Sequence, residues 1–198
     1  MRRTFCVLLI MICSVTIPAR SQQSQDGSSL FAKLNQTSTT DRAAKHILEA
    51  ASQDPAVRQQ ATEKLPEMID KGEINEVWLN AVRLAGHLKV LEAVPSLQKA
   101  FLPGKVEIGR PAVMTMATEG LLNDDVVAKA LAEIGDPSLP AVKGFLKSAD
   151  PKMRRRAVLI LTNINSSASR SLLQDHLPGE TDPGIKNLIK RWQDRVQQ

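Results

Sequence analysis

Aromatic residues are scarce in this chain. Phe, Trp and Tyr together make up 3% of its 198 residues, and Tyr is absent. A core must therefore be built from aliphatic side chains, and the residue type most used for stacking on nucleic-acid bases is missing. Hydrophobic residues at 42% and charged residues at 24% are typical of a soluble globular domain. The length is sufficient for one such domain with a sizeable core.

The first 21 residues have the pattern of a secretory signal peptide. Arg2 and Arg3 supply its positive charge, and residues 5–17 form an apolar run that is too short to span a bilayer comfortably. Pro18 ends this run. The pattern predicts a secreted or periplasmic protein, with no stable membrane insertion after the signal is cleaved. The alternative is that residues 1–21 are kept as an uncleaved anchor.

Small residues at positions 19 and 21 predict cleavage between Ser21 and Gln22. Both cysteines, Cys6 and Cys13, lie before this point. The mature chain would contain no cysteine, which excludes disulfides, thiolate metal sites and cysteine nucleophiles.

The charge of the predicted mature protein is close to balanced. Lys and Arg number 26 against 21 Asp and Glu, and loss of Arg2, Arg3 and Arg20 leaves 23 basic residues and a net charge of +2. This balance does not indicate nucleic-acid binding. The run 154–156 is three arginines, but consecutive helical residues point about 100° apart, so they fan around a helix. We expect them to be structural or solvated.

Turn signals and apolar periodicity divide the chain into three parts. Residues 1–21 are the signal peptide, and residues 41–198 form one domain. Residues 22–40 are rich in Ser, Gln and Thr and are predicted to form a flexible linker, within which Leu30, Phe31 and Leu34 are candidates for a short helical turn that docks on the domain. This domain has about ten amphipathic helices and no strand candidate. Within it, residues 102–110 have the character of an insertion, and a helix is predicted at 111–122.

One phrase recurs at the start of helices. Asp150-Pro151 combines a good N-cap with a proline suited to the first helical position. The same phrase occurs at Asp54-Pro55 and at Asp182-Pro183. A helix hairpin cannot bury its own apolar face, so repeated hairpins are expected to stack and share a core.

Two stretches carry a resemblance to a known family. Residues 81–86 followed by 92–97, and residues 130–142 continuing into 150–154, resemble HEAT repeats of the short bacterial, PBS-lyase-like form. The resemblance extends loosely over 41–198. It implies an all-α, armadillo-like fold, a right-handed α-solenoid of stacked antiparallel helix hairpins. It further implies a non-catalytic, monomeric scaffold or adaptor that binds a protein or peptide and no nucleic acid.

In such a solenoid, the second helices of successive repeats usually line the concave binding side. On these helices the sequence offers a polar, mildly basic strip suited to an acidic peptide or protein segment. The predicted binding residues are Gln98, Lys99, Lys143, Lys147, Arg170 and Gln174.

Motifs for catalysis are not found. The chain has no zinc-binding pair on a helix, nucleophile elbow, phosphate-cradling glycine loop or dinucleotide fingerprint. His46, His87 and His176 lie in different helices and are predicted to be half-exposed surface groups. Asp124 and Asp125 are predicted to cap a helix instead of forming a catalytic pair. We therefore predict no catalytic residue, metal or cofactor.

Two other functions remain open at this point. The first is an enzyme or enzyme-accessory subunit on a HEAT-like fold, similar to a lyase, which the clustering of a histidine with acids in one cleft would favour. The second is a structural cell-envelope protein, which retention of residues 1–21 would favour. Trp78 is predicted to lie in the core, and Trp192 is a candidate interface anchor.

Overall fold

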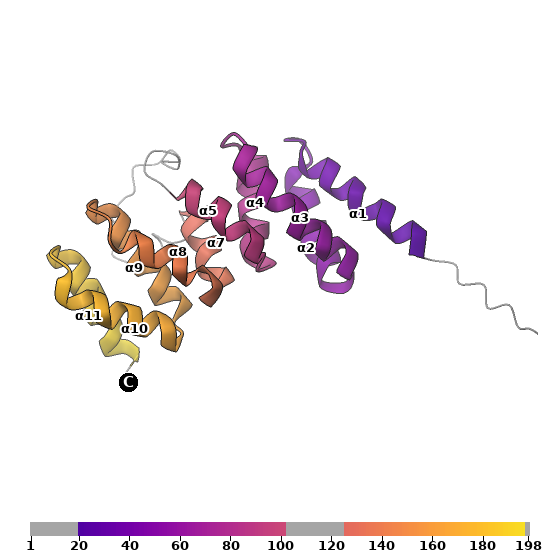
Figure 1. The fold of residues 1–198 in the computed structure, drawn as a ribbon. Coiled ribbons are helices and arrows are strands. Elements are labelled where there is room, and N and C mark those ends of the chain that lie inside the picture. The colour runs from indigo at the N-terminus through magenta and orange to yellow at the C-terminus, as the bar shows by residue number, and fades with distance from the viewer. Residues whose placement is uncertain (1–19, 102–124, 197–198) are drawn as a thin grey trace, which may run out of the picture.

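A computed structural model describes residues 20–101 and 125–196 of this chain. The segment 1–19, the predicted insertion and helix between 102 and 122, and Asp124 lie outside these residues. Every regular element in the described ranges is a helix (Figure 1). The α-helices are α1 (Arg20–Leu34), α2 (Thr40–Gln53), α3 (Pro55–Lys71), α4 (Glu76–His87), α5 (Val94–Ala100), α7 (Val126–Ile134), α8 (Leu139–Phe145), α9 (Pro151–Ile164), α10 (Ser167–His176) and α11 (Pro183–Val196). Short 3₁₀ helices are η1 (Leu91–Ala93), η2 (Asp136–Ser138) and η3 (Leu177–Gly179).

The helices form a row of pairs that follows the chain from α1 at one end to α11 at the other (Figure 1). Helices α2, α4, α7, α9 and α11 contact one another in succession and form the first layer. Helices α1, α3, α5 and α8 also contact in succession and form the second layer, and α10 packs on α9. The fold is therefore the all-helical α-solenoid that the sequence predicted.

Local capping starts and ends these helices as predicted. The Asp54 carboxylate accepts a hydrogen bond from the Ala56 backbone N–H, and Asp150 accepts one from Lys152, with proline at the first helical position in both cases. Gly135 ends α7 with φ of 85°, a left-handed value that favours glycine.

Two of the three Asp-Pro phrases nevertheless begin helices in different layers. The helix that follows Asp54 is α3, which packs between α1 and α5 of the second layer. The helix that follows Asp150 is α9, which packs between α7 and α11 of the first. The phrase marks where a helix begins, because capping involves only neighbouring residues. It does not determine the layer of that helix, which depends on the helices that its buried face contacts.

One continuous hydrophobic core runs through the row, from Phe31 on α1 to Trp192 on α11. It is dominated by aliphatic side chains, as the scarcity of aromatic residues required. Trp78 is 3% exposed, which confirms its predicted place in the core. Trp192 is 6% exposed, so it packs on the interior face of α11 and is not available as an interface anchor. None of the described helices combines the length and apolarity that crossing a bilayer would take.

Helix α1 occupies much of the range that was predicted to be a flexible linker. The reason is that Phe31 and Leu34, three residues apart on one helical face, are both fully buried against the domain. Helix α1 packs on α2 and α3 and so covers the start of the second layer. The composition of residues 22–40 is polar, but these two apolar side chains suffice to dock the helix.

Candidate interaction surface

The six predicted binding residues lie on or directly after second helices of the pairs, and all six are exposed. Gln98 and Lys99 are on α5, Lys143 is on α8, Lys147 follows α8, and Arg170 and Gln174 are on α10. Helices α5 and α8 contact each other, whereas α10 packs on α9. The structure thus places the first four on adjacent helices and the last two one helix pair further along.

These cations differ in how they are paired. Lys99 Nζ lies 3.2 Å from Asp70 Oδ1. The Arg170 guanidinium donates to the side-chain oxygen of Asn165 at 3.1 Å. Lys143 and Lys147, one turn apart, form no ion pair with any described residue. Among the described residues, Lys143, Lys147 and Arg170 of the strip have no acidic partner, and of these three only Arg170 is held by a hydrogen bond from its side chain.

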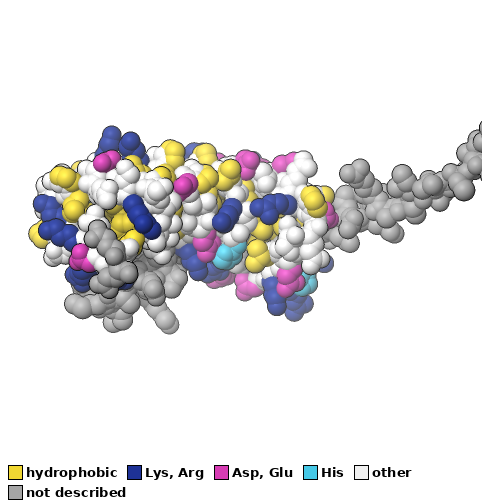
Figure 2. Space-filling view, turned by 90° about the horizontal axis from the view of Figure 1, so that it is seen from below, with side chains coloured by type: hydrophobic (Ala, Val, Ile, Leu, Met, Phe, Trp, Pro, Cys, Tyr) yellow, Lys and Arg dark blue, Asp and Glu magenta, His cyan; other side chains and the backbone are white. Residues whose placement is uncertain are grey.

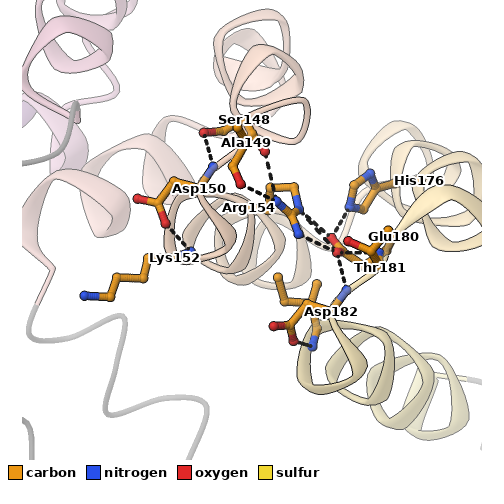
Figure 3. A network of polar contacts seen from close by, with 10 residues as sticks. Ser148, Ala149, Asp150, Lys152, Arg154, His176, Glu180, Thr181 and Asp182 are labelled. Atoms are coloured by element: carbon orange, nitrogen blue, oxygen red, sulfur yellow. Dashed lines mark hydrogen bonds and ion pairs between the residues drawn. The ribbon is translucent and has the colours of Figure 1, made fainter.

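A buried cluster of polar groups joins α9, α10 and α11 (Figure 3). The Glu180 side chain is fully buried, and the Arg154 side chain is 12% exposed. Arg154 donates to both carboxylate oxygens, from Nε at 2.9 Å and from Nη2 at 2.8 Å. The backbone N–H groups of Thr181 and Asp182 donate to the same carboxylate at 2.8 Å. A buried charge needs this number of donors because it has lost its hydration.

Hydrogen bonds from Arg154 are the main reason that the pKa of Glu180 falls from 4.5 to about 2. They outweigh burial, which alone would raise that pKa. Arg154 also donates to the backbone oxygens of Ser148 and Ala149, at 3.0 and 3.1 Å. One guanidinium therefore connects the turn before α9 to the turn before α11.

His176 completes this cluster and corrects a prediction. Its Nε2 lies 2.9 Å from Glu180 Oε2, and its side chain is only 15% exposed. It was predicted to be a half-exposed surface group, but η3 turns the chain so that Glu180 meets it four residues later. His46 and His87 are exposed, as predicted.

A second arginine of the same run has a different set of partners. Arg156 Nε donates to the Asp125 carboxylate, and its Nη1 donates to the Phe101 carbonyl at 2.7 Å. Its guanidinium also lies 3.8 Å from the centre of the Phe101 ring, which is stacked on Phe145. Asp125 caps α7 at the same time, by accepting from the Ala128 N–H. Arg156 thus binds both residues that flank segment 102–124.

The arginine run therefore fans out as predicted: Arg154 and Arg156 serve the structure, and Arg155 is exposed. The partners of Arg154 were not predicted from the sequence. The only signals for them are that Arg154 holds the fifth position of the Asp-Pro phrase, and that Glu180 lies two residues before the next such phrase.

The junction between α4 and α7 is close and carries another histidine. His87 Nδ1 lies 3.0 Å from Glu133 Oε2 across this junction. A Cβ atom on Gly86 would lie 2.7 Å from the Cα atom of Ala130, so glycine is needed for this approach. The histidines lie on α2, α4 and α10, and His46 forms no polar contact with a described residue. Two histidines therefore each meet one glutamate at separate places, His87 with Glu133 and His176 with Glu180, and neither pair lines the two hollows beside α3 and α4.

Two shallow hollows adjoin the turn between α3 and α4. They have volumes of about 420 and 450 Å³, and Gly72, Glu73 and Trp78 line both. Their rims carry the ion pairs Glu67–Lys71, at 2.7 Å, and Asp70–Lys99. In residues 20–101 and 125–196, no group of three or more His, Cys, Asp or Glu side chains is placed to hold a metal ion. The lining of both hollows thus combines the apolar ring of Trp78 with charged side chains.

Helices α7 to α11 form capped pairs that share one core, and this part of the chain resembles a known family. Residues 124–190 match the family model of HEAT repeats. The match covers about one third of the chain, including Lys143, Lys147, Arg170 and Gln174. None of the curated proteins and none of the solved structures compared with the chain matches it.

The HEAT match begins one residue before the N-cap of α7 and ends within α11. It contains both arginine clusters, Arg154 with Glu180 and Arg156 with Asp125. The helices before residue 102 extend the same two layers, because α4 packs on α7 and α5 packs on α8.

Proposed function

We propose that this chain is a non-catalytic scaffold that is exported and then binds an acidic segment of a partner protein. HEAT repeats commonly act as protein-interaction scaffolds and typically carry no catalytic centre. The match of residues 124–190 to HEAT repeats and the continuation of both layers through α4 and α5 support this function. The predicted N-terminal signal supports export.

The binding surface is placed at two lysines near the end of α8. Lys143, on the second helix of the HEAT-like pair α7–α8, and Lys147, in the turn directly after it, are exposed and form no ion pair in the described residues. Cations without an intramolecular partner attract an acidic segment and raise its association rate. Gln98, Lys99, Arg170 and Gln174 extend this strip with hydrogen-bonding groups on the neighbouring second helices.

The test is capture of a partner by tagged residues 22–198 from an extracytoplasmic extract at moderate salt, compared with the tag alone. The captured protein is then titrated against the wild type and the variant K143E/K147E. The control is K33E/R42E, which makes the same change in charge at two exposed residues of α1 and α2 that have no ion pair among the described residues. We expect K143E/K147E to weaken binding at least tenfold, about 1.4 kcal/mol, and the control to bind as the wild type does.

Two results would contradict this function. One is a specific partner whose affinity is the same for K143E/K147E and for the control. The other is the absence of any specific partner from a sample whose circular dichroism shows folded helices.

A further inference from the structure

The net positive charge of the described residues comes from one half of the chain. Residues 20–101 contain ten Lys and Arg and ten Asp and Glu, a net charge of zero. Residues 125–196 contain twelve Lys and Arg against eight Asp and Glu, a net charge of +4. Such asymmetry between two halves indicates that the basic half meets an anionic partner.

Much of this excess lies at the end of the row formed by α9 and α11. Helix α11 buries Ile185, Leu188, Ile189 and Trp192 on one face. The rest of its surface carries four basic residues and one acid, Asp194. We define the basic end as these four residues together with the exposed arginine of α9: Arg155, Lys186, Lys190, Arg191 and Arg195.

The basic end is not neutralised by acids of the described residues. Arg155 lies near the first turn of α11. Its Nη1 is 3.9 Å from the position that a Cβ atom would take if Gly184 carried one. Lys186 is partly exposed, and the other four are exposed. None of the five forms an ion pair within residues 20–101 and 125–196. The nearby acids are already used, since Glu180 binds Arg154 and Asp182 caps α11 through the Ile185 N–H.

The position of the basic end makes it accessible. Helix α11 is the last described helix of the row, and it packs on α9. Figure 2 shows Lys and Arg side chains at the end of the molecule formed by the last helices, as well as along the rest of the same face. A flat partner can contact this end without meeting the rest of the row.

The chemistry of the surface distinguishes a membrane from a protein partner. Stable protein interfaces centre on buried aromatic or aliphatic anchors. The large apolar side chains that are exposed in the described residues, Leu48, Ile74 and Leu91, all lie in the other half of the chain. A surface of anionic lipid headgroups, in contrast, binds clustered Lys and Arg without any apolar anchor. We propose that the basic end binds peripherally to anionic phospholipid, on a surface distinct from the strip at Lys143 and Lys147.

The experiment measures sedimentation of the full chain with phosphatidylcholine vesicles that contain or lack phosphatidylserine. The full chain is used so that any contribution of residues 1–21 is the same in every variant. Each basic side chain near an anionic surface contributes about fivefold to the partition coefficient. We expect K190Q/R191Q to lower partitioning onto phosphatidylserine vesicles by about 25-fold. The control K33Q/R42Q, with the same change in net charge on α1 and α2, should stay within about twofold of the wild type.

Three results overturn this inference. They are equal partitioning onto vesicles with and without phosphatidylserine, equal loss in K190Q/R191Q and the control, and binding that does not weaken as salt rises. A short DNA duplex is the competing polyanion. If it binds more tightly than the vesicles and is equally sensitive to K190Q/R191Q, the basic end recognises nucleic-acid phosphates instead. The outcome is independent of protein capture, because the two tests change different residues.

Discussion

Replacing Glu180 with glutamine removes the negative charge at the centre of the cluster in Figure 3 and keeps the size of the side chain. Arg154 would then remain 12% exposed with no carboxylate to bind. The two backbone donors and His176 would face a neutral amide in place of a carboxylate. We expect E180Q to destabilise the folded protein because it leaves a buried cation unpaired.

The size of this effect follows from the pKa of Glu180, which falls from 4.5 to about 2 on folding. Each pKa unit corresponds to about 1.4 kcal/mol, so the carboxylate contributes about 3 kcal/mol to the free energy of unfolding. Because the folded-state pKa is lower than the unfolded one, this contribution is fully present above pH 4.5. It is lost as the pH falls from 4.5 through about 2.

Urea unfolding followed by circular dichroism measures this effect at pH 7 and at steps down to pH 2. E180Q should lose about 3 kcal/mol at pH 7, and its difference from the wild type should shrink towards pH 2. The control is D175N, which removes an exposed carboxylate from α10 and should change stability by less than about 0.5 kcal/mol. The reasoning is refuted if E180Q is as stable as D175N at pH 7, or if its deficit does not depend on pH.

Three further changes test the packing. G86A should lower the melting temperature, because the new Cβ would lie 2.7 Å from a Cα atom of α7, and overpacking of this kind costs about 1–3 kcal/mol. G144A places its Cβ on α8 with no atom within 4 Å, so it should raise the melting temperature through about 0.5–1 kcal/mol of helix propensity; a lower value for G144A would contradict this account. R156K keeps the charge but loses the planar contacts to Asp125 and Phe101. It should lower the free energy of unfolding, measured in urea, by about 1–3 kcal/mol. An unchanged unfolding midpoint would show that Arg156 does not hold these two residues together.

The helices themselves could be predicted from the sequence, because their starts and ends are decided locally. Asp54 and Asp150 cap their helices through backbone groups two residues away. Gly135 ends α7 through its own backbone conformation. Apolar periodicity then separates the buried face of each helix from the exposed one, and the repeated phrase indicates that the helices stack.

The candidate surface was predicted only in part. The exposure of Lys143 follows from its position on the polar face of α8, and Lys147 is exposed in the turn that follows this helix. Whether a cation is already paired depends on contacts between helices. Lys99 binds Asp70, which lies 29 positions earlier in the chain. No pattern along the chain indicates that pairing.

The sequence by itself determined the class of this protein: an all-helical chain of repeats with an aliphatic core. Tertiary structure alone decided which layer each helix joins, that α1 is a full helix from Arg20 to Leu34 and not a short turn in a linker, and that His176 is buried against Glu180. It also decided the separate roles of Arg154, Arg155 and Arg156, which are neighbours along the chain. The physical reason is the distance along the chain over which each interaction acts. Capping and periodicity act within a few residues, whereas burial and ion pairing depend on side chains that only folding brings together.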